Sequence, residues 1–147
     1  MLERRKTPWR VALVTVTFNS GHVLADFLNS LDGQSNRDWE LVVVDNASND
    51  DTLDQLNSWQ GPLHLIKNVE NLGFAVATNQ GISFAQSGNF DAVMLLNNDT
   101  QFDPEVMDQL FNYQLSTGVP LLSPAITYAD EPGRFWFADG GFTNLRG

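Results

Sequence analysis

Four short polar segments of this 147-residue chain each follow an apolar run, and their side chains are of types that bind nucleotides and cations. Asn97, Asn98 and Asp99 follow the most hydrophobic of these runs. Mg²⁺ is commonly held by one or two carboxylates and completed by phosphate oxygens of the substrate, so we expect Asp99 to be a metal ligand. The alternative is an Asx-type turn that opens the next helix, although Asp103-Pro104 offers that helix a second start.

The first and second polar segments contain groups that suit a nucleoside. Thr17 and Asn19 offer a hydroxyl and an amide that can meet a base or a ribose. Asp45, beside Asn46, offers a carboxylate that can accept a hydrogen bond from the imino N–H of a base. The alternative role of both segments is to begin the helices that follow, and Asp50 and Asp51 are better placed than Asp45 to cap the second helix.

The third polar segment suits a phosphate. Asn71 and Gly73 form a turn before a helix, and Asn79 adds a side-chain amide further along that helix. The N-terminus of a helix favours negative charge because its backbone N–H groups are unpaired. The alternative is that the glycine only marks the start of the helix.

The elements that must position these segments alternate between strand and helix. Continuous apolar runs at residues 11–16 and 41–44 indicate strands covered on both faces, and two further strands are expected at residues 63–66 and 91–96. Apolar residues at helical spacing predict helices within residues 23–31, 52–59, 74–84 and 104–113. This order predicts an α/β fold with a mostly parallel sheet and helices on both faces, whose ligands bind at the carboxyl ends of the strands.

The last part of the chain gives a weaker pattern. Leu121 and Leu122, near Pro120, predict a short fifth strand. Beyond Asp130 we expect an aromatic loop. Residues 1–9 are expected to form a flexible arm, and residues 10–147 a single domain.

The composition excludes several classes of function. With 18 acidic and 8 basic residues the net charge is -10, which argues against a nucleic-acid-binding surface. The absence of cysteine excludes disulfides and thiolate chemistry, and no G-x-G-x-x-G motif follows the first strand, which disfavours a dinucleotide-binding fold. No apolar run approaches the about 20 residues of a membrane span, so we expect a cytoplasmic protein, with peripheral contact to the inner face of the membrane as an alternative.

In their order and spacing the four segments resemble family 2 glycosyltransferases, particularly the rhamnosyltransferase-like members. The matching stretches are residues 14–19, 42–48, 71–74 with 79–81, and 95–99. Trp136 followed by Gly140-Gly141 is similar to the aromatic and glycine segment that these enzymes carry after their fifth strand. The resemblance covers nearly the whole chain from Arg10 onward.

The resemblance implies a GT-A fold that binds a UDP, dTDP or GDP sugar for inverting, metal-dependent transfer to a glycan or lipid-linked acceptor in cell-surface polysaccharide synthesis. It implies Asp45 near the base, Asn97 or Asn98 near the ribose and sugar, and Asp99 on Mg²⁺ or Mn²⁺. Two departures from the family pattern are present. Asparagines occupy the first two positions of the acidic metal motif, which predicts weak metal binding without nucleotide, and Thr78 stands where many relatives carry Arg.

Inverting members also use a downstream Asp or Glu as the general base that deprotonates the acceptor. Asp130, Glu131 and Asp139 lie too early to match that base, so the catalytic residue is not identified. We therefore expect the chain to stop at Gly147 before the acceptor side, and to bind a donor without transferring its sugar. Two interpretations stay open, namely part of a longer enzyme and a non-catalytic nucleotide-sugar-binding module.

Overall fold

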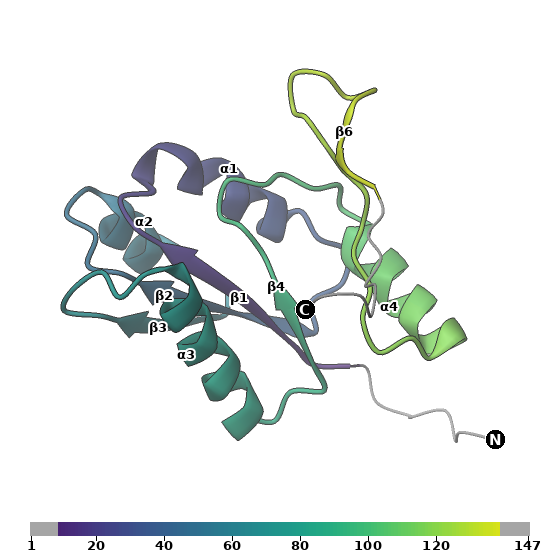
Figure 1. The fold of residues 1–147 in the computed structure, drawn as a ribbon, viewed down its shortest axis with the longest axis horizontal. Coiled ribbons are helices and arrows are strands. Elements are labelled where there is room, and N and C mark those ends of the chain that lie inside the picture. The colour runs from purple at the N-terminus through teal and green to yellow at the C-terminus, as the bar shows by residue number, and fades with distance from the viewer. Residues whose placement is uncertain (1–8, 139–147) are drawn as a thin grey trace, which may run out of the picture. The chain divides into compact units, whose positions relative to one another are not determined.

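A four-stranded parallel sheet organises the chain up to Met107 (Figure 1). The computed structural model describes residues 9–138. The sheet has the order β3-β2-β1-β4, and each neighbouring pair is parallel. Its strands are β1 (Val11–Thr17), β2 (Trp39–Asp45), β3 (Leu63–Lys67) and β4 (Ala92–Leu95). The predicted α/β class and parallel sheet are thereby confirmed.

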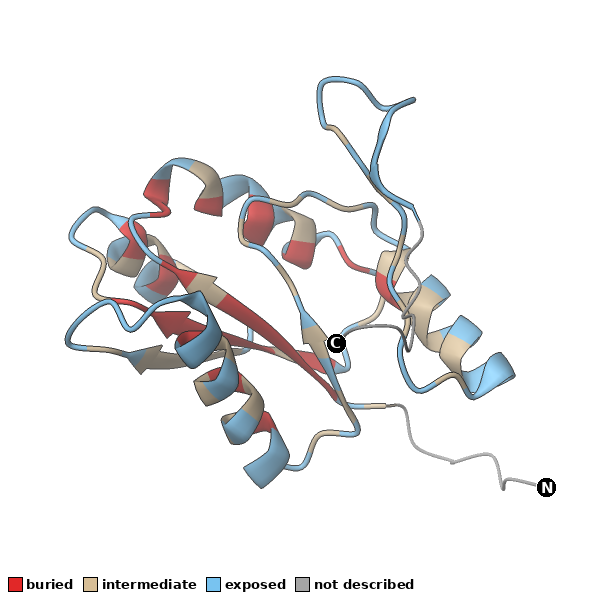
Figure 2. Ribbon diagram, in the orientation of Figure 1, coloured by how far each residue is buried: buried red, intermediate tan, exposed pale blue. Residues whose placement is uncertain are grey.

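Helices cover both faces of this sheet. Figure 1 shows α1 (Gly21–Asp32) and α2 (Thr52–Ser58) on one face and α3 (Phe74–Ser87) on the other. The two central strands are buried along nearly their whole length, as Figure 2 shows in red. This is why their sequences are continuous apolar runs without alternation. Among the helices of the described residues, none has the length and apolar character needed to span a membrane.

Small side chains let α3 lie close against β1 and β2. Its buried residues are Ala77, Gly81 and Ala85, which are four residues apart and therefore share one face. A Cβ placed on Gly81 would come within 2.4 Å of the Cγ1 atom of Val14. The absence of a side chain at position 81 therefore sets how closely the middle of α3 packs against β1.

The fourth strand lies at the edge of the sheet and is only partly covered. Its residues alternate between half-buried and exposed, and Val93 and Leu95 are 39% and 56% exposed. The prediction of a strand here is confirmed, and its exposure sets it apart from the buried strands β1 and β2. An edge strand keeps one side open, and its apolar sequence does not reveal that position.

The segment from Asp108 to residue 138 forms a second compact unit with a different pattern. The helix α4 (Val106–Thr117) begins at its boundary, and β5 (Ile126–Thr127) pairs antiparallel with β6 (Phe135–Phe137). The predicted strand at Leu121 and Leu122 is wrong, because prolines at 120 and 124 remove backbone donors on both sides. The loop expected beyond Asp130 is also wrong at Phe135–Phe137, which forms β6.

Some expectations concern residues outside the described range. Most of the predicted arm at 1–9, the Gly140-Gly141 pair and Asp139 lie there. Of the other two acidic residues weighed as a base, Glu131 is exposed and pairs with Arg134 at 3.2 Å, and Asp130 is exposed.

Candidate functional site

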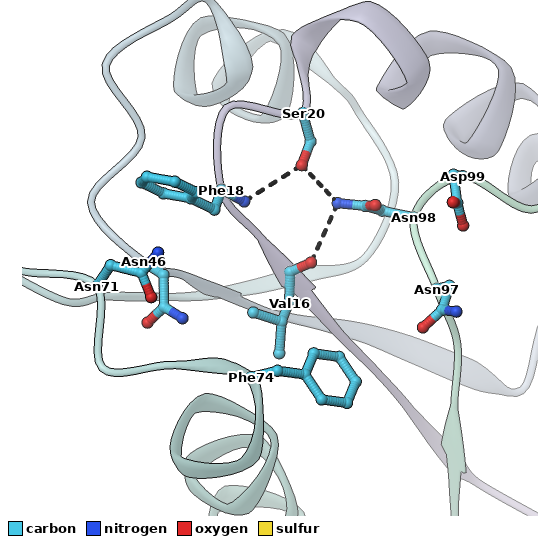
Figure 3. A pocket seen from close by; sticks show the side chains of 9 residues that line it. All are labelled: Val16, Phe18, Ser20, Asn46, Asn71, Phe74, Asn97, Asn98 and Asp99. Carbon is cyan, nitrogen blue, oxygen red and sulfur yellow. Dashed lines mark hydrogen bonds between the residues drawn. The ribbon is translucent and has the colours of Figure 1, made fainter.

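The carboxyl ends of the four parallel strands meet at one pocket of about 300 Å³ (Figure 3). Each loop that follows a strand contributes to it, as expected for an open parallel sheet. The lining residues are Val16, Phe18, Ser20, Asn46, Asn71, Phe74, Asn97, Asn98 and Asp99. Five of the ten predicted site residues are in this lining: Asn46, Asn71, Asn97, Asn98 and Asp99. The structure thus brings together polar groups from segments that are far apart in sequence.

The lining combines amides, two aromatic rings and a single charged group. Phe18 and Phe74 are 48% and 64% exposed and offer apolar surface to a planar ligand. Among the residues that the structure describes, Asp99 is the one charged side chain of the lining, which contains no Lys or Arg. An anionic ligand would therefore meet no positive side chain in this pocket and would need a bound cation to offset its charge.

The carboxylate of Asp99 is available for a ligand. Its side chain is exposed, and neither Asp99 nor the neighbouring Asn97 makes a side-chain hydrogen bond or ion pair with the described residues. In residues 9–138 no three His, Asp or Glu side chains cluster as a metal site. The donor set fits a cation that is held by few protein oxygens and completed by a ligand, which is common for Mg²⁺.

The side chain of Asn98 fastens the loop after β4 to the end of β1. Its Nδ2 donates to the backbone carbonyl of Val16 at 3.1 Å and to Oγ of Ser20 at 2.8 Å (Figure 3). The same Ser20 oxygen accepts from the backbone N–H of Phe18 at 3.2 Å. Both Nδ2 hydrogens of Asn98 are therefore used within the protein, and its Oδ1 is left for a ligand.

The carboxylate of Asp45 is buried and bonded within the protein. It is 1% exposed and accepts hydrogen bonds from the Thr17 hydroxyl at 2.7 Å, the Ser48 backbone N–H at 3.0 Å and the Ser48 hydroxyl at 2.5 Å. Thr17 itself is fully buried. Neither Asp45 nor Thr17 belongs to the lining, and together they join the ends of β1 and β2.

Three other predicted residues also lie outside the lining. Asn19, in the left-handed region with φ 51°, accepts at Oδ1 from the Asn49 backbone N–H at 2.8 Å, and so ties the loop after β1 to the loop after β2. Gly73 precedes α3 with φ 83°, a conformation that favours glycine. Asn79 is exposed on α3. The binding roles of all ten residues remain predictions.

Asp50 connects the starts of two helices beside this site. Its carboxylate accepts from the hydroxyl of Thr52 at 2.5 Å and from the backbone N–H of Gly21 at 3.0 Å. The hydrogen bond from the Thr52 hydroxyl is the largest effect on the pKa of Asp50 and lowers it. The backbone N–H groups of Gly21 and Thr52 lower it further, and desolvation opposes them. As the sequence indicated, Asp50 rather than Asp45 accepts a hydrogen bond from the first turn of the following helix, at the Thr52 N–H, and it also accepts one from the start of α1.

Several lining residues were not assigned from the sequence. The lining also contains Phe18, Ser20 and Phe74, which stand within the stretches that resemble the family. The two phenylalanines were missed because the sequence was searched for polar groups that bind a ligand. A usable signal was the position of Phe74 directly after a glycine turn, where a helix of this fold begins at the strand ends. Gln80, which stands beside Asn79, is the residue whose amide faces inward to Asn68.

Comparisons with known proteins agree with this geometry. A family model described as glycosyl transferase family 2 matches residues 12–145. TuaG of Bacillus subtilis (strain 168), a glycosyltransferase named for teichuronic acid biosynthesis, is 28% identical over 114 residues, covering 74% of this chain and 44% of TuaG. The chain spans less than half the length of the curated relatives it matches.

Two solved structures share the fold. S. aureus TarS in complex with UDP-GlcNAc gives a TM-score of 0.66 at 19% identity, covering 80% of this chain and 40% of that chain. The mannosyltransferase PcManGT from Pyrobaculum calidifontis, in complex with GDP-Man and Mn2+, gives 0.64 at 22% identity, covering 83% and 38%. The fold is the GT-A type of α/β fold, and the chain belongs to glycosyl transferase family 2.

Proposed function

We propose that the pocket is the donor site of a sugar transferase and binds the diphosphate of a nucleotide sugar together with a divalent cation. One observation carries this proposal: all four strand-end segments converge on a pocket that has one available carboxylate and no basic side chain. A diphosphate entering such a site needs a cation, and a cation held by one carboxylate needs a diphosphate. The two ligands are therefore expected to bind together.

The lining residues suggest a role for each part of the donor. Asp99, with Asn97 beside it, would hold Mg²⁺ or Mn²⁺, which offsets the charge of the diphosphate when bound. The start of α3 has Gly73 at its cap position, and no side chain caps it. Its backbone N–H groups lie beside Asn71 and Phe74 and would favour a phosphate. The free Oδ1 of Asn98 suits a ribose or sugar hydroxyl.

The relatives support the donor class. TarS and PcManGT are described in complex with UDP-GlcNAc and with GDP-Man and Mn2+ respectively. TuaG is named for the synthesis of a cell-surface polymer. We extend this to a family 2 enzyme of cell-surface polysaccharide synthesis that takes a UDP, dTDP or GDP sugar and transfers it with inversion to a glycan or lipid-linked acceptor. Its closer likeness to rhamnosyltransferases is part of the same proposal.

Isothermal titration calorimetry with UDP, dTDP and GDP tests the proposal. We expect binding with Mn²⁺ that is lost on addition of EDTA, and a loss of about tenfold or more in affinity for Asp99→Asn, as for a charge-assisted contact. Asp103→Asn, which removes an exposed carboxylate outside the lining, is the matched control. Binding that is unaffected by EDTA or by Asp99→Asn would refute the assigned role of Asp99.

A rival function is donor binding without transfer. Asp99 is the one carboxylate in the pocket lining, and the proposed metal role occupies it. A general base typically contributes about a hundredfold to ten-thousandfold in rate. We expect the 147-residue chain to hydrolyse a nucleotide sugar slowly at most, with no transfer to an acceptor. Rapid transfer of a radiolabelled sugar to a glycan or lipid-linked acceptor would exclude the binding module.

A further inference from the structure

A series of hydrogen-bonded amides leads from the outer helix α3 to the pocket. Gln80 and Asn68 exchange two hydrogen bonds, in which Asn68 Nδ2 donates to Gln80 Oε1 at 2.9 Å and Gln80 Nε2 donates to Asn68 Oδ1 at 3.0 Å. Asn68 Nδ2 also donates to Asn46 Oδ1 at 2.8 Å. Asn46, which is 2% exposed and lines the pocket, donates from Nδ2 to the carbonyl oxygen of Gly73 at 3.3 Å.

The Gly73 carbonyl at one end of this series sets the direction of the bonds that follow. The Gly73 carbonyl can only accept, so Asn46 must turn its Nδ2 toward Gly73 and its Oδ1 toward Asn68. Both Nδ2 hydrogens of Asn68 are then used, and its Oδ1 is satisfied by Gln80. One Nδ2 hydrogen of Asn46 remains without a partner in the series. The Gly73 carbonyl therefore sets which way the Asn46 amide points, and the two bonds from Gln80 hold Asn68 in the position where its Nδ2 meets Asn46 Oδ1.

The same series holds the turn that precedes α3. The Gly73 carbonyl bound by Asn46 also accepts the first helical bond of α3 from the Ala77 N–H at 3.2 Å. On either side of this glycine, Asn71 and Phe74 line the pocket. No side chain caps this end of α3 among the described residues, and the bond from Asn46 ties it to the loop after β2.

We propose that Gln80 is a positioning residue for the donor site, which holds Asn68 against Asn46 and so keeps the Asn46 amide in the orientation that offers an N–H to an acceptor oxygen of the nucleotide. Gln80 does not line the pocket and acts only through the other two amides. The inference rests on the proposed function, because it concerns how the same pocket is organised to bind its donor. A site whose side chains are already held in place binds more tightly, because those side chains lose less conformational entropy when the ligand binds.

The variant Gln80→Glu tests this role with almost no change in shape. An ionised Glu can still accept from Asn68 Nδ2, but it places an acceptor against Asn68 Oδ1 where Gln80 donated. A protonated Glu restores the donor, and its pKa should rise beside an acceptor. We expect affinity for UDP or GDP with Mn²⁺, relative to wild type at the same pH, to be about tenfold lower near pH 7.5 and within about twofold near pH 5.

Gln86→Glu, the same substitution at an exposed position of α3, is the matched control and should match wild type at both pH values. Equal affinity of Gln80→Glu and wild type, or a deficit that does not change with pH, would overturn the inference while leaving the proposed function intact. Absence of any UDP or GDP binding by the wild type with Mn²⁺ would overturn both.

A second variant covers the case in which Gln80→Glu does not fold near neutral pH. Gln80→Met removes both bonds to Asn68 without adding charge, and thermal unfolding shows whether it is folded. We expect folded Gln80→Met to bind about tenfold more weakly at both pH values, since the half-buried amide of Asn68 has lost both of its bonds to residue 80. Wild-type affinity in this variant would overturn the inference.

Discussion

Asp45 and Asp99 each stand at the end of a parallel strand, but they differ in what surrounds them. Asp45 is buried and accepts three hydrogen bonds from Thr17 and Ser48. Asp99 is exposed and has no side-chain partner among the described residues. A buried carboxylate is tolerated only when it is well hydrogen-bonded, so its removal leaves buried partners unpaired. Removal of an exposed carboxylate costs the fold little stability. Removing Asp45 should therefore affect folding, and removing Asp99 should affect binding.

We expect Asp45→Ala to lower the free energy of unfolding by about 2 to 4 kcal/mol, because the Thr17 hydroxyl and the Ser48 N–H lose their acceptor in a buried site. Urea denaturation followed by circular dichroism measures the change. Asp99→Ala should change stability by less than about 0.5 kcal/mol. Equal stability of Asp45→Ala and wild type would show that water replaces the carboxylate, and would leave nucleotide recognition as the main role of Asp45.

The sequence predicted the location of the site better than the orientation of its side chains. Asn97, Asn98 and Asp99 were correctly expected at one edge of the sheet, because parallel strands bring their carboxyl ends together. Asn79 was the residue of α3 predicted to meet a ligand, whereas Gln80 is the one whose amide faces inward, because the local sequence does not reveal the phase of α3 relative to the sheet. That phase depends on which residues of α3 pack on β1 and β2, which is a tertiary property.

At the scale of elements, β1 and β2 were predictable because buried parallel strands have a distinctive composition. The partners of the helix starts were not. The α1 helix has Ser20 at its N-cap without a side-chain cap, and the acceptor for the Gly21 N–H comes from Asp50 in the loop after β2. Such contacts join residues about thirty positions apart, and local capping rules do not include them.

Asp50 should make stability depend on acidic pH. Its pKa is lowered in the folded protein, mainly by the Thr52 hydroxyl, so its stabilising effect is complete above the unfolded pKa and is lost as pH falls through the folded value. We expect the difference in Tm between wild type and Asp50→Asn to be constant above about pH 5 and to shrink below about pH 4. Asp54→Asn, at an exposed position of α2, controls for loss of one negative charge. A difference that is constant down to about pH 2 would contradict this role.

The fit of α3 against the sheet predicts that Gly81→Ala is destabilising although alanine favours helix. The helix preference contributes about 1 kcal/mol, whereas overpacking against Val14 costs about 1 to 3 kcal/mol. A double-mutant cycle with Val14→Ala should give a favourable coupling of about 1 kcal/mol or more, since the smaller residue makes room. Ser83→Ala, at an exposed position of the same helix, is the control. Additive effects at positions 81 and 14 would contradict the contact.

At the scale of the whole molecule, an apolar sheet edge is combined with a strongly acidic chain. Among the described residues β4 pairs only with β1, and Val93 and Leu95 are exposed beside its open edge. Unpaired edges promote association with other strands, while a net charge of -10 opposes it through repulsion between copies. Ionic strength should decide which effect dominates, because salt screens charge and leaves apolar contacts in place.

We therefore expect the 147-residue chain to be monomeric at low salt and to self-associate as salt is raised from about 0.01 M to about 0.5 M, where the screening length falls from about 30 Å to a few ångströms. Sedimentation velocity at both ionic strengths measures this. Val93→Thr with Leu95→Thr keeps a strand-compatible sequence but removes apolar surface, and should abolish the association. Val69→Thr, which alters a loop residue that is 98% exposed, should leave it unchanged. Association that weakens with salt would show that charge pairs, rather than the edge of β4, bring the copies together.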